Sequence, residues 1–159
     1  MKFAKIAFLL MCFFVNPVLA HDVVLMDEDG DALVVLSLLP EWSAVAARDA
    51  LELTSPNDRT RIHCVELRSS ATVEEGKVFL KTMRETLFQT YQENPEQPTE
   101  IDGVPAILYS GRGISRGFDT YLEALVFREP GGRVCLVMLQ QDVGYESKVT
   151  DLKTMVRLP

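Results

Sequence analysis

The chain has 159 residues, a net charge of −7, and 47% hydrophobic and 25% charged residues. This length and composition are typical of one globular domain with one core, and not of a disordered or fibrous protein. So acidic a chain is repelled by phosphate backbones and anionic membrane surfaces, which argues against a nucleic-acid-binding protein.

The first twenty residues have the pattern of a secretory signal peptide. Two lysines precede an apolar run over residues 6–15, and Val18-Leu19-Ala20 resembles a signal-peptidase site. The apolar run is shorter than the about 20 residues that a membrane span needs. We predict cleavage after Ala20, a single mature domain over residues 21–159, and a periplasmic or secreted location. Loss of both lysines and no acid changes the net charge from −7 to −9.

The mature chain begins with a predicted hairpin. Residues 23–26 and 32–38 are β-rich and flank an acidic turn with three aspartates. An EF-hand loop would need Gly at its sixth position and Glu at its twelfth, where this sequence has Ala32 and Leu38. We therefore interpret the acidic segment as a solvated turn and not as a calcium site.

The next segment contains two further predicted strands. After Pro40-Glu41-Trp42, the small residues up to Ala47 predict an irregular stretch or one helical turn, with Trp42 as a core or lid aromatic. Residues 50–54 and 60–67 predict strands, joined by a turn of Ser, Pro, Asn and Asp.

A capping-box pattern at Thr72 and Glu75 marks the start of a helix. Apolar residues behind it recur at three- and four-residue steps, so we predict an amphipathic helix from Thr72 to Tyr91 that covers a sheet. Residues 94–98 predict a polar linker after it. The apolar stripe consists of Val73, Leu80, Met83, Leu87 and Tyr91.

The C-terminal part is the most apolar and β-rich. Residues 106–109 predict a strand, and residues 110–117, SGRGISRG, a glycine-rich basic loop. Residues 119–140 predict two strands joined by the turn Glu129-Pro130-Gly131-Gly132. A final helix is predicted to begin at residue 146 or 147. Its apolar face would hold Val149, Leu152 and Val156.

One segment matches a catalytic motif. Gly113-Ile114-Ser115-Arg116-Gly117 fits the G-x-S-x-G pattern, which mounts a nucleophilic serine between a strand and a helix, with its His later in the chain. Here a strand follows, no His occurs after Ser115, and only His63 upstream remains as a base. We therefore favour a hairpin loop, predict no catalytic residue, and keep a small hydrolase as an alternative.

The two histidines suggest a second alternative. Cleavage after Ala20 would make His21 the amino terminus, where its amine and imidazole can chelate copper with His63 as a third nitrogen donor. We favour an exposed terminal His and an unrelated strand His, and we predict no metal and no cofactor.

Two cysteines remain after cleavage, Cys64 and Cys135, both in predicted strands. An oxidising compartment permits a disulfide between them, and buried free thiols are the other interpretation. A disulfide requires Cα atoms within about 7 Å, which the sequence does not supply, so both alternatives stay open.

Charged residues at the predicted turns are candidate contacts to a partner protein. Arginines lie near the turns of the C-terminal hairpins, and acids fill the first turn, although exposed charges at hairpin ends are also ordinary surface features. The candidate contacts are Arg112, Arg116, Arg128, Arg133, Asp27, Glu28 and Asp29.

The predicted order of elements is β-β-β-β-α-β-β-β-α. With residues 51–56 (LELTSP) opening a strand, residues 101–106 (IDGVPA) after the helix and the turn FREPGG at residues 127–132, the chain resembles the PsbP/DcrB-like superfamily over residues 32–158. The resemblance implies an exported α+β protein, a PsbP-like sandwich with two main helices packed on an antiparallel sheet. Members include extrinsic photosystem subunits, periplasmic envelope factors and immunity proteins, and they share no catalytic residues.

We therefore expect an exported, non-enzymatic binding protein that contacts another protein in the cell envelope, as an immunity or inhibitor protein or as an envelope accessory factor. The alternatives from other classes are a small copper protein that uses His21 and a small hydrolase. The resemblance concerns the fold, and fold-level analogy alone does not establish the function.

Overall fold

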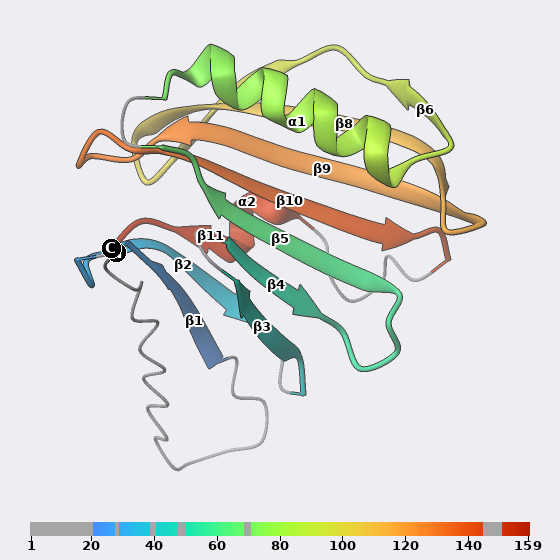
Figure 1. Cartoon of the computed structure of the whole chain (residues 1–159), viewed down its shortest axis with the longest axis horizontal. Helices are drawn as coiled ribbons and strands as arrows, with labels where there is room; N and C mark the ends of the chain where they lie inside the picture. Colours follow the sequence, from blue (N-terminus) through green and yellow to red (C-terminus); the bar gives the residue numbers. More distant parts are fainter. Residues whose placement is uncertain (1–20, 28, 39–40, 48–49, 69–70, 145–150) are drawn as a thin grey trace.

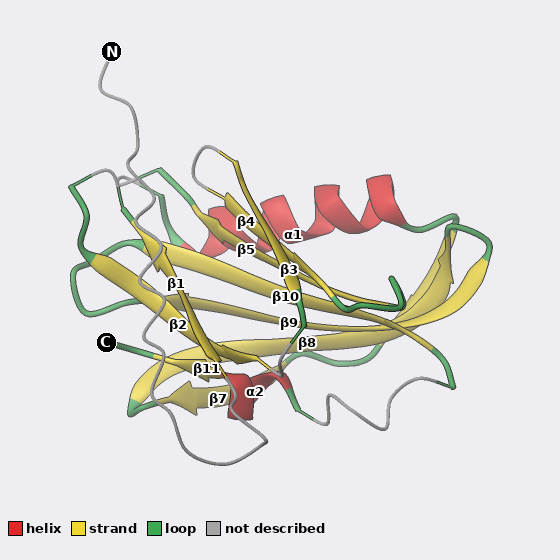
Figure 2. Ribbon diagram, turned by 90° about the horizontal axis from the view of Figure 1, so that it is seen from below, coloured by secondary structure: helices red, strands yellow, loops and turns green. Residues whose placement is uncertain are grey.

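The computed structural model describes residues 21–159 apart from residues 28, 39–40, 48–49, 69–70 and 145–150. The predicted signal peptide and Glu28 therefore lie outside the described residues. The described part forms three layers, in which a helix and a small sheet cover opposite faces of a large antiparallel sheet (Figures 1 and 2).

The large sheet has eight strands, in the order β3-β4-β5-β10-β9-β8-β6, with β7 paired to β8. All their pairings are antiparallel. Its strands are β3 (Ser43–Ala47), β4 (Ala50–Thr54), β5 (Thr60–Glu66), β6 (Thr90–Glu93), β7 (Gln97–Ile101), β8 (Val104–Ser115), β9 (Phe118–Arg128) and β10 (Val134–Asp142).

The small sheet joins the two ends of the described chain. Strand β1 (His21–Met26) pairs with β2 (Ala32–Leu38), which confirms the predicted first hairpin. Strand β11 (Val156–Arg157) adds to the other edge of β2. The small sheet lies on the face of the large sheet opposite the long helix (Figure 2).

Strand β10 is the centre of the molecule. All nine of its residues are buried because successive side chains face the two covered sides of the sheet in turn. Cys135, Val137 and Leu139 belong to the core between the two sheets, whereas Leu136 and Met138 belong to the core under the helix. The predicted hairpin is confirmed, since β9 and β10 pair along their length around the predicted turn.

Helix α1 (Val73–Leu87) begins where the capping box predicts. The Glu75 amide donates to Thr72 Oγ1 over 3.2 Å, and the Thr72 amide donates to Glu75 Oε2 over 2.7 Å. The predicted end at Tyr91 is wrong, because the helix ends at Leu87 and Tyr91 lies in β6. Strand pairing with β8 takes over at that point.

The predicted loop over residues 110–117 is also wrong, since β8 runs on to Ser115. Its glycines let β6 approach closely. A Cβ on Gly111 would lie 2.4 Å from the Gln92 carbonyl oxygen, and one on Gly113 would lie 2.0 Å from the Thr90 carbonyl oxygen. The glycines therefore serve a close strand contact and not a flexible loop.

Two further predictions need correction. The small residues that suggested an irregular stretch form the strand β3, which pairs with β4. The predicted polar linker over residues 94–98 instead leads into β7, which begins at Gln97.

The second main helix is not found in the described residues. Helix α2 (Leu152–Met155) is a single turn after the N-cap Asp151, Val156 lies in β11, and the predicted start at residues 146–147 lies outside the described residues. The α+β class is confirmed, but the second covering layer is the small sheet rather than a second long helix. Among the described helices, none has the length and apolarity to cross a bilayer.

Candidate functional site

Ser115 is not arranged as a nucleophile. It is 3% exposed, and its hydroxyl donates to the Leu87 carbonyl oxygen over 2.9 Å, which ties the end of β8 to the end of α1. His63 lies on β5, separated from β8 by β10 and β9, so the two residues are at least about 14 Å apart at the usual strand spacing. The structure does not bring them together as a catalytic pair.

His63 lies on the α1 side of the large sheet. Its side chain is 17% exposed, Nδ1 is 3.9 Å from Glu52 Oε2, and Nε2 is buried without a hydrogen-bond partner. Burial lowers the pKa of His63, and the neighbouring Glu52 carboxylate and Gln140 side chain oppose that shift. The imidazole is therefore mainly neutral at pH 7.

The lowered pKa of His63 makes the stability of the protein pH-dependent. The folded state binds this proton more weakly than the unfolded state does. The contribution of neutral His63 to the free energy of unfolding is therefore fully present above the ordinary pKa of 6.5, and it is lost as the pH falls towards the folded pKa. Chemical denaturation should show a slope of up to about 1.4 kcal/mol per pH unit below pH 6.5 that His63→Gln removes. The same slope in the variant would contradict this assignment.

The two histidine positions lie on different layers. His21 is in β1 of the small sheet and pairs with Leu38, whereas His63 faces the α1 side of the large sheet. The side chain of His21 lies outside what the structure describes, so the copper chelate named as an alternative stays a hypothesis. Within the described residues, no group of three or more His, Cys, Asp or Glu side chains converges as a metal site.

Cys64 and Cys135 are both free and fully buried. They lie on the same face of adjacent strands, offset by two residues, since Cys64 is opposite Val137 and Cys135 is opposite Glu66. Burial raises the pKa of both thiols, that of Cys135 to about 12. In the structure the two cysteines are therefore free thiols rather than a disulfide, and little of either is present as reactive thiolate at neutral pH.

The acidic first turn is tied to the large sheet. Asp27 is 4% exposed, and its Oδ1 accepts from the amides of Asp29 and Asp31 over 2.9 and 2.8 Å. Its Oδ2 lies 2.8 Å from Arg133, which also pairs with Glu66 of β5. The structure thus makes Asp27 and Arg133 part of a bridge between the two sheets, whereas Asp29 remains exposed.

Arg128 has a similar internal role. Its guanidinium donates to the Ala71 carbonyl oxygen over 2.9 Å and to the Gly132 carbonyl oxygen. These contacts join the segment before α1 to the β9–β10 turn. Arg128 is exposed, but its guanidinium is used to hold two loops together.

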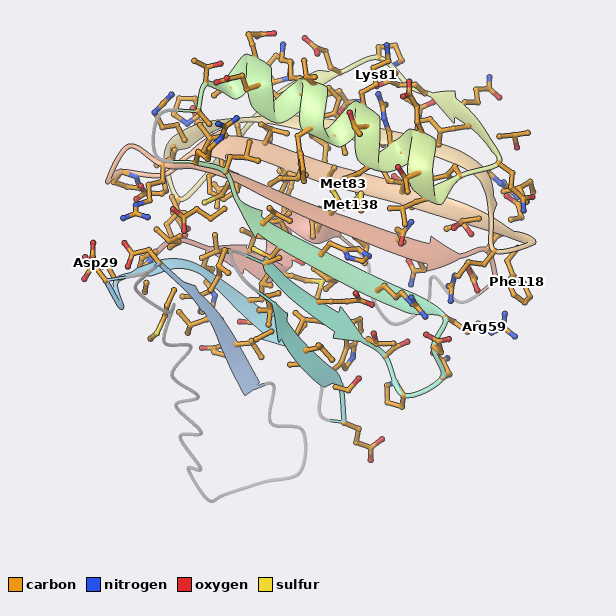
Figure 3. All side chains as sticks on the ribbon, viewed as in Figure 1. Asp29, Arg59, Lys81, Met83, Phe118 and Met138 are labelled. Carbon is orange, nitrogen blue, oxygen red and sulfur yellow. The ribbon has the colours of Figure 1, made fainter. Side chains whose placement is uncertain are left out.

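At the opposite end of β9, the β4–β5 and β8–β9 turns meet. Phe118 is 44% exposed, and the Arg59 guanidinium lies 4.3 Å from its ring centroid. Arg116 Nη1 lies 3.4 Å from Asp58 Oδ2 and so connects the two turns. We call Arg59, Phe118, Arg116 and Asp58 the turn surface. Figure 3 shows Phe118 and Arg59 together at this end of the molecule, far from Asp29.

The backbone at the turn surface is unusual. Arg116 and Gly117 form a two-residue hairpin loop with φ of 54° and 80°, a geometry that favours Asn-Gly. Asp58 has φ of 56°. A left-handed backbone costs an ordinary residue roughly 1 kcal/mol, so Arg116 is held there at some cost to stability.

The four arginines named as candidate contacts lie at two separate turns. Arg116 lies at the β8–β9 turn and Arg112 pairs with Asp119 near it, whereas Arg128 and Arg133 lie at the β9–β10 turn. Strand β9 has 11 residues and separates the two turns by roughly 35 Å. Sequence reasoning missed Arg59 and Phe118, because only the fold brings the β4–β5 turn to the β8–β9 turn.

The sequence matches no family model and no curated protein. Its structure is similar to that of the cyanobacterial PsbP protein CyanoP from Synechocystis sp. PCC 6803, with a TM-score of 0.62 and 14% identity over 94% of this chain and 98% of that one. It is also similar to LpqN, involved in cell envelope biogenesis of Mycobacterium tuberculosis, with a TM-score of 0.55 and 15% identity over 91% of this chain and 93% of that one. The chain therefore has the PsbP-like fold that the order of its sequence elements predicted.

Proposed function

We propose that this chain is an exported, non-catalytic protein that binds a partner protein in the cell envelope through the turn surface. The observation that carries the proposal is the exposed ring of Phe118 beside the guanidinium of Arg59. Aromatic residues and arginine are enriched among the residues that contribute most to protein–protein binding.

The strained backbone supports the same surface. Asn or Gly would relieve the left-handed conformation at position 116, yet Arg stands there and contacts Asp58 across the two turns. Residues in rare backbone conformations gather at binding and catalytic sites, where function offsets their cost. The nearby Ser115 is committed to a main-chain carbonyl, which favours binding over catalysis.

Location in the envelope rests on two further observations. The first twenty residues have the pattern of a cleavable export signal. LpqN, a protein of the same fold, is involved in cell envelope biogenesis in its own organism. An immunity or inhibitor protein is one specific form of this proposal, and an envelope accessory factor is the other.

Site-specific crosslinking in the native envelope tests the proposal. A photoreactive phenylalanine in place of Phe118 should give one adduct of defined mass, because the ring would lie inside the interface. The same label in place of Val78, which is 65% exposed on α1, is the matched control and should give none.

A second variant tests whether the adduct at position 118 depends on the other residues of the turn surface. Arg116→Asn keeps the left-handed turn and removes the guanidinium, so stability should stay within about 1 kcal/mol while the adduct at position 118 falls at least about tenfold. Equal adducts from positions 118 and 78, or none from either, would refute the proposed binding surface.

A further inference from the structure

The imidazole of His63 is the starting point. Its buried Nε2 makes no hydrogen bond of normal geometry, and the Gln140 side chain lies beside the ring. Met138 lies directly opposite His63 in the β5–β10 pair, so both side chains project from the same face of the sheet. Met138 is fully buried in the core under α1. A nitrogen donor and a thioether are thus neighbours on the covered face of the sheet.

Helix α1 brings a second thioether to the same level. A Cβ on Gly76 would lie 3.3 Å from Val134 Cγ1, which fixes that helical turn above the start of β10. Since Leu87 meets Ser115 at the other end, α1 runs in the same direction as β10. Met83 lies about 10 Å beyond Gly76 along the helix, and Met138 lies about 13 Å beyond Val134 along the strand. The two methionines are therefore at similar positions along the common direction of α1 and β10, within the length of a methionine side chain.

The orientation of the helix also directs Met83 towards β5. Lys77 and Arg84 lie on the flank that faces β6, since they pair with Glu96 and Glu93. Met83 lies on the opposite flank of the stripe centred on Leu80 and packs against the core that contains Met138. Both side chains belong to the contact region between the helix and the sheet, and Figure 3 labels them at the same level along α1.

We propose that His63, Met83 and Met138 form a binding site for a soft monovalent metal ion, Cu(I), between α1 and the large sheet. Thioether sulfur selects Cu(I) over harder ions, and a neutral imidazole nitrogen is a common copper ligand. The site uses Nε2 of His63, which makes no hydrogen bond of normal geometry and has the Gln140 side chain as a neighbour.

The surroundings suit such a site. Glu52 lies near the other ring nitrogen of His63, the place where metal-bound imidazoles usually have a carboxylate or carbonyl partner. The His63 side chain is 17% exposed and Met83 is half-buried, so two of the three proposed ligands are partly accessible to solvent. The site is distinct from the turn surface and does not depend on the proposed partner.

Titration with Ag(I), a redox-inert substitute for Cu(I), tests the proposal on the purified protein labelled at the methionine methyl groups. The methyl signals of Met83 and Met138 should shift together and saturate at one equivalent. The signals of Met26 and Met155, which lie in or beside the small sheet, should not move.

Affinity for Cu(I) is then measured by competition with a chromophoric Cu(I) chelator. Met83→Leu, Met138→Leu and His63→Gln should each weaken binding at least about tenfold, and the leucine variants nearly conserve volume and so should fold. Met155→Leu is the matched control and should bind like the wild type. Unmoved Met83 and Met138 methyl signals, or unchanged affinity in these variants, would overturn the proposal.

Discussion

Phe127→Ala is expected to lower the free energy of unfolding by about 3–5 kcal/mol, the usual cost of removing a buried aromatic ring. Phe127 is fully buried in the core between the two sheets, so the smaller side chain leaves a cavity there. Urea denaturation followed by circular dichroism measures the loss.

Phe118→Ala is the matched control on the same strand. Its ring is 44% exposed and contacts Arg59, so its removal should cost less than about 1 kcal/mol. Losses of equal size at positions 127 and 118 would contradict the structure, in which the first ring is buried and the second is exposed.

Asp27→Ala should cost about 2–3 kcal/mol. The substitution removes the acceptor of two turn amides and one of the carboxylates that pair with Arg133. Leaving buried partners unsatisfied costs more than the net gain of an ordinary hydrogen bond. Thermal and urea unfolding both report the change.

Asp29→Ala provides the comparison for this bridge. The Asp29 side chain is 74% exposed and lies 4.0 Å from Arg133, so its loss should change stability by about 0.5 kcal/mol or less. A cost at position 27 no greater than that at position 29 would show that the bridge between the sheets contributes little.

The two ends of β9 differ in the contacts that their residues make. Residues at the β9–β10 end join the layers. At the turn surface Arg59 and Arg116 pair with the buried Asp142, and the Phe118 ring is left exposed to solvent. This difference makes Phe118 a better position for binding tests than Asp27 or Arg133.

Sequence patterns located the elements whose signals are local. Thr72 and Glu75 predicted the helix start because a capping box acts within one turn. The end was missed because Tyr91 continues the apolar stripe, yet pairs in β6 with Gly113. That pairing depends on residues that lie more than a turn away in sequence, which helix periodicity does not report.

The candidate sites were less predictable for the same reason. Glycines at positions 111 and 113 suggested a loop, but in the fold they make room for the backbone of β6. The turn surface joins Asp58 and Arg116, and the methionine site joins Met83 and Met138. Each pair comes from segments far apart in the chain, so no local spacing could reveal it.

The central position of β10 also determines when the sheet can be completed. Both of its neighbours, β5 and β9, precede it in the chain, so each has an open edge until β10 has emerged during synthesis. Open edges are sites of aggregation, and such long-range pairing is slow to form. The large sheet therefore stays in two separate parts, β3-β4-β5 and β6 to β9, until almost the whole chain has been synthesised.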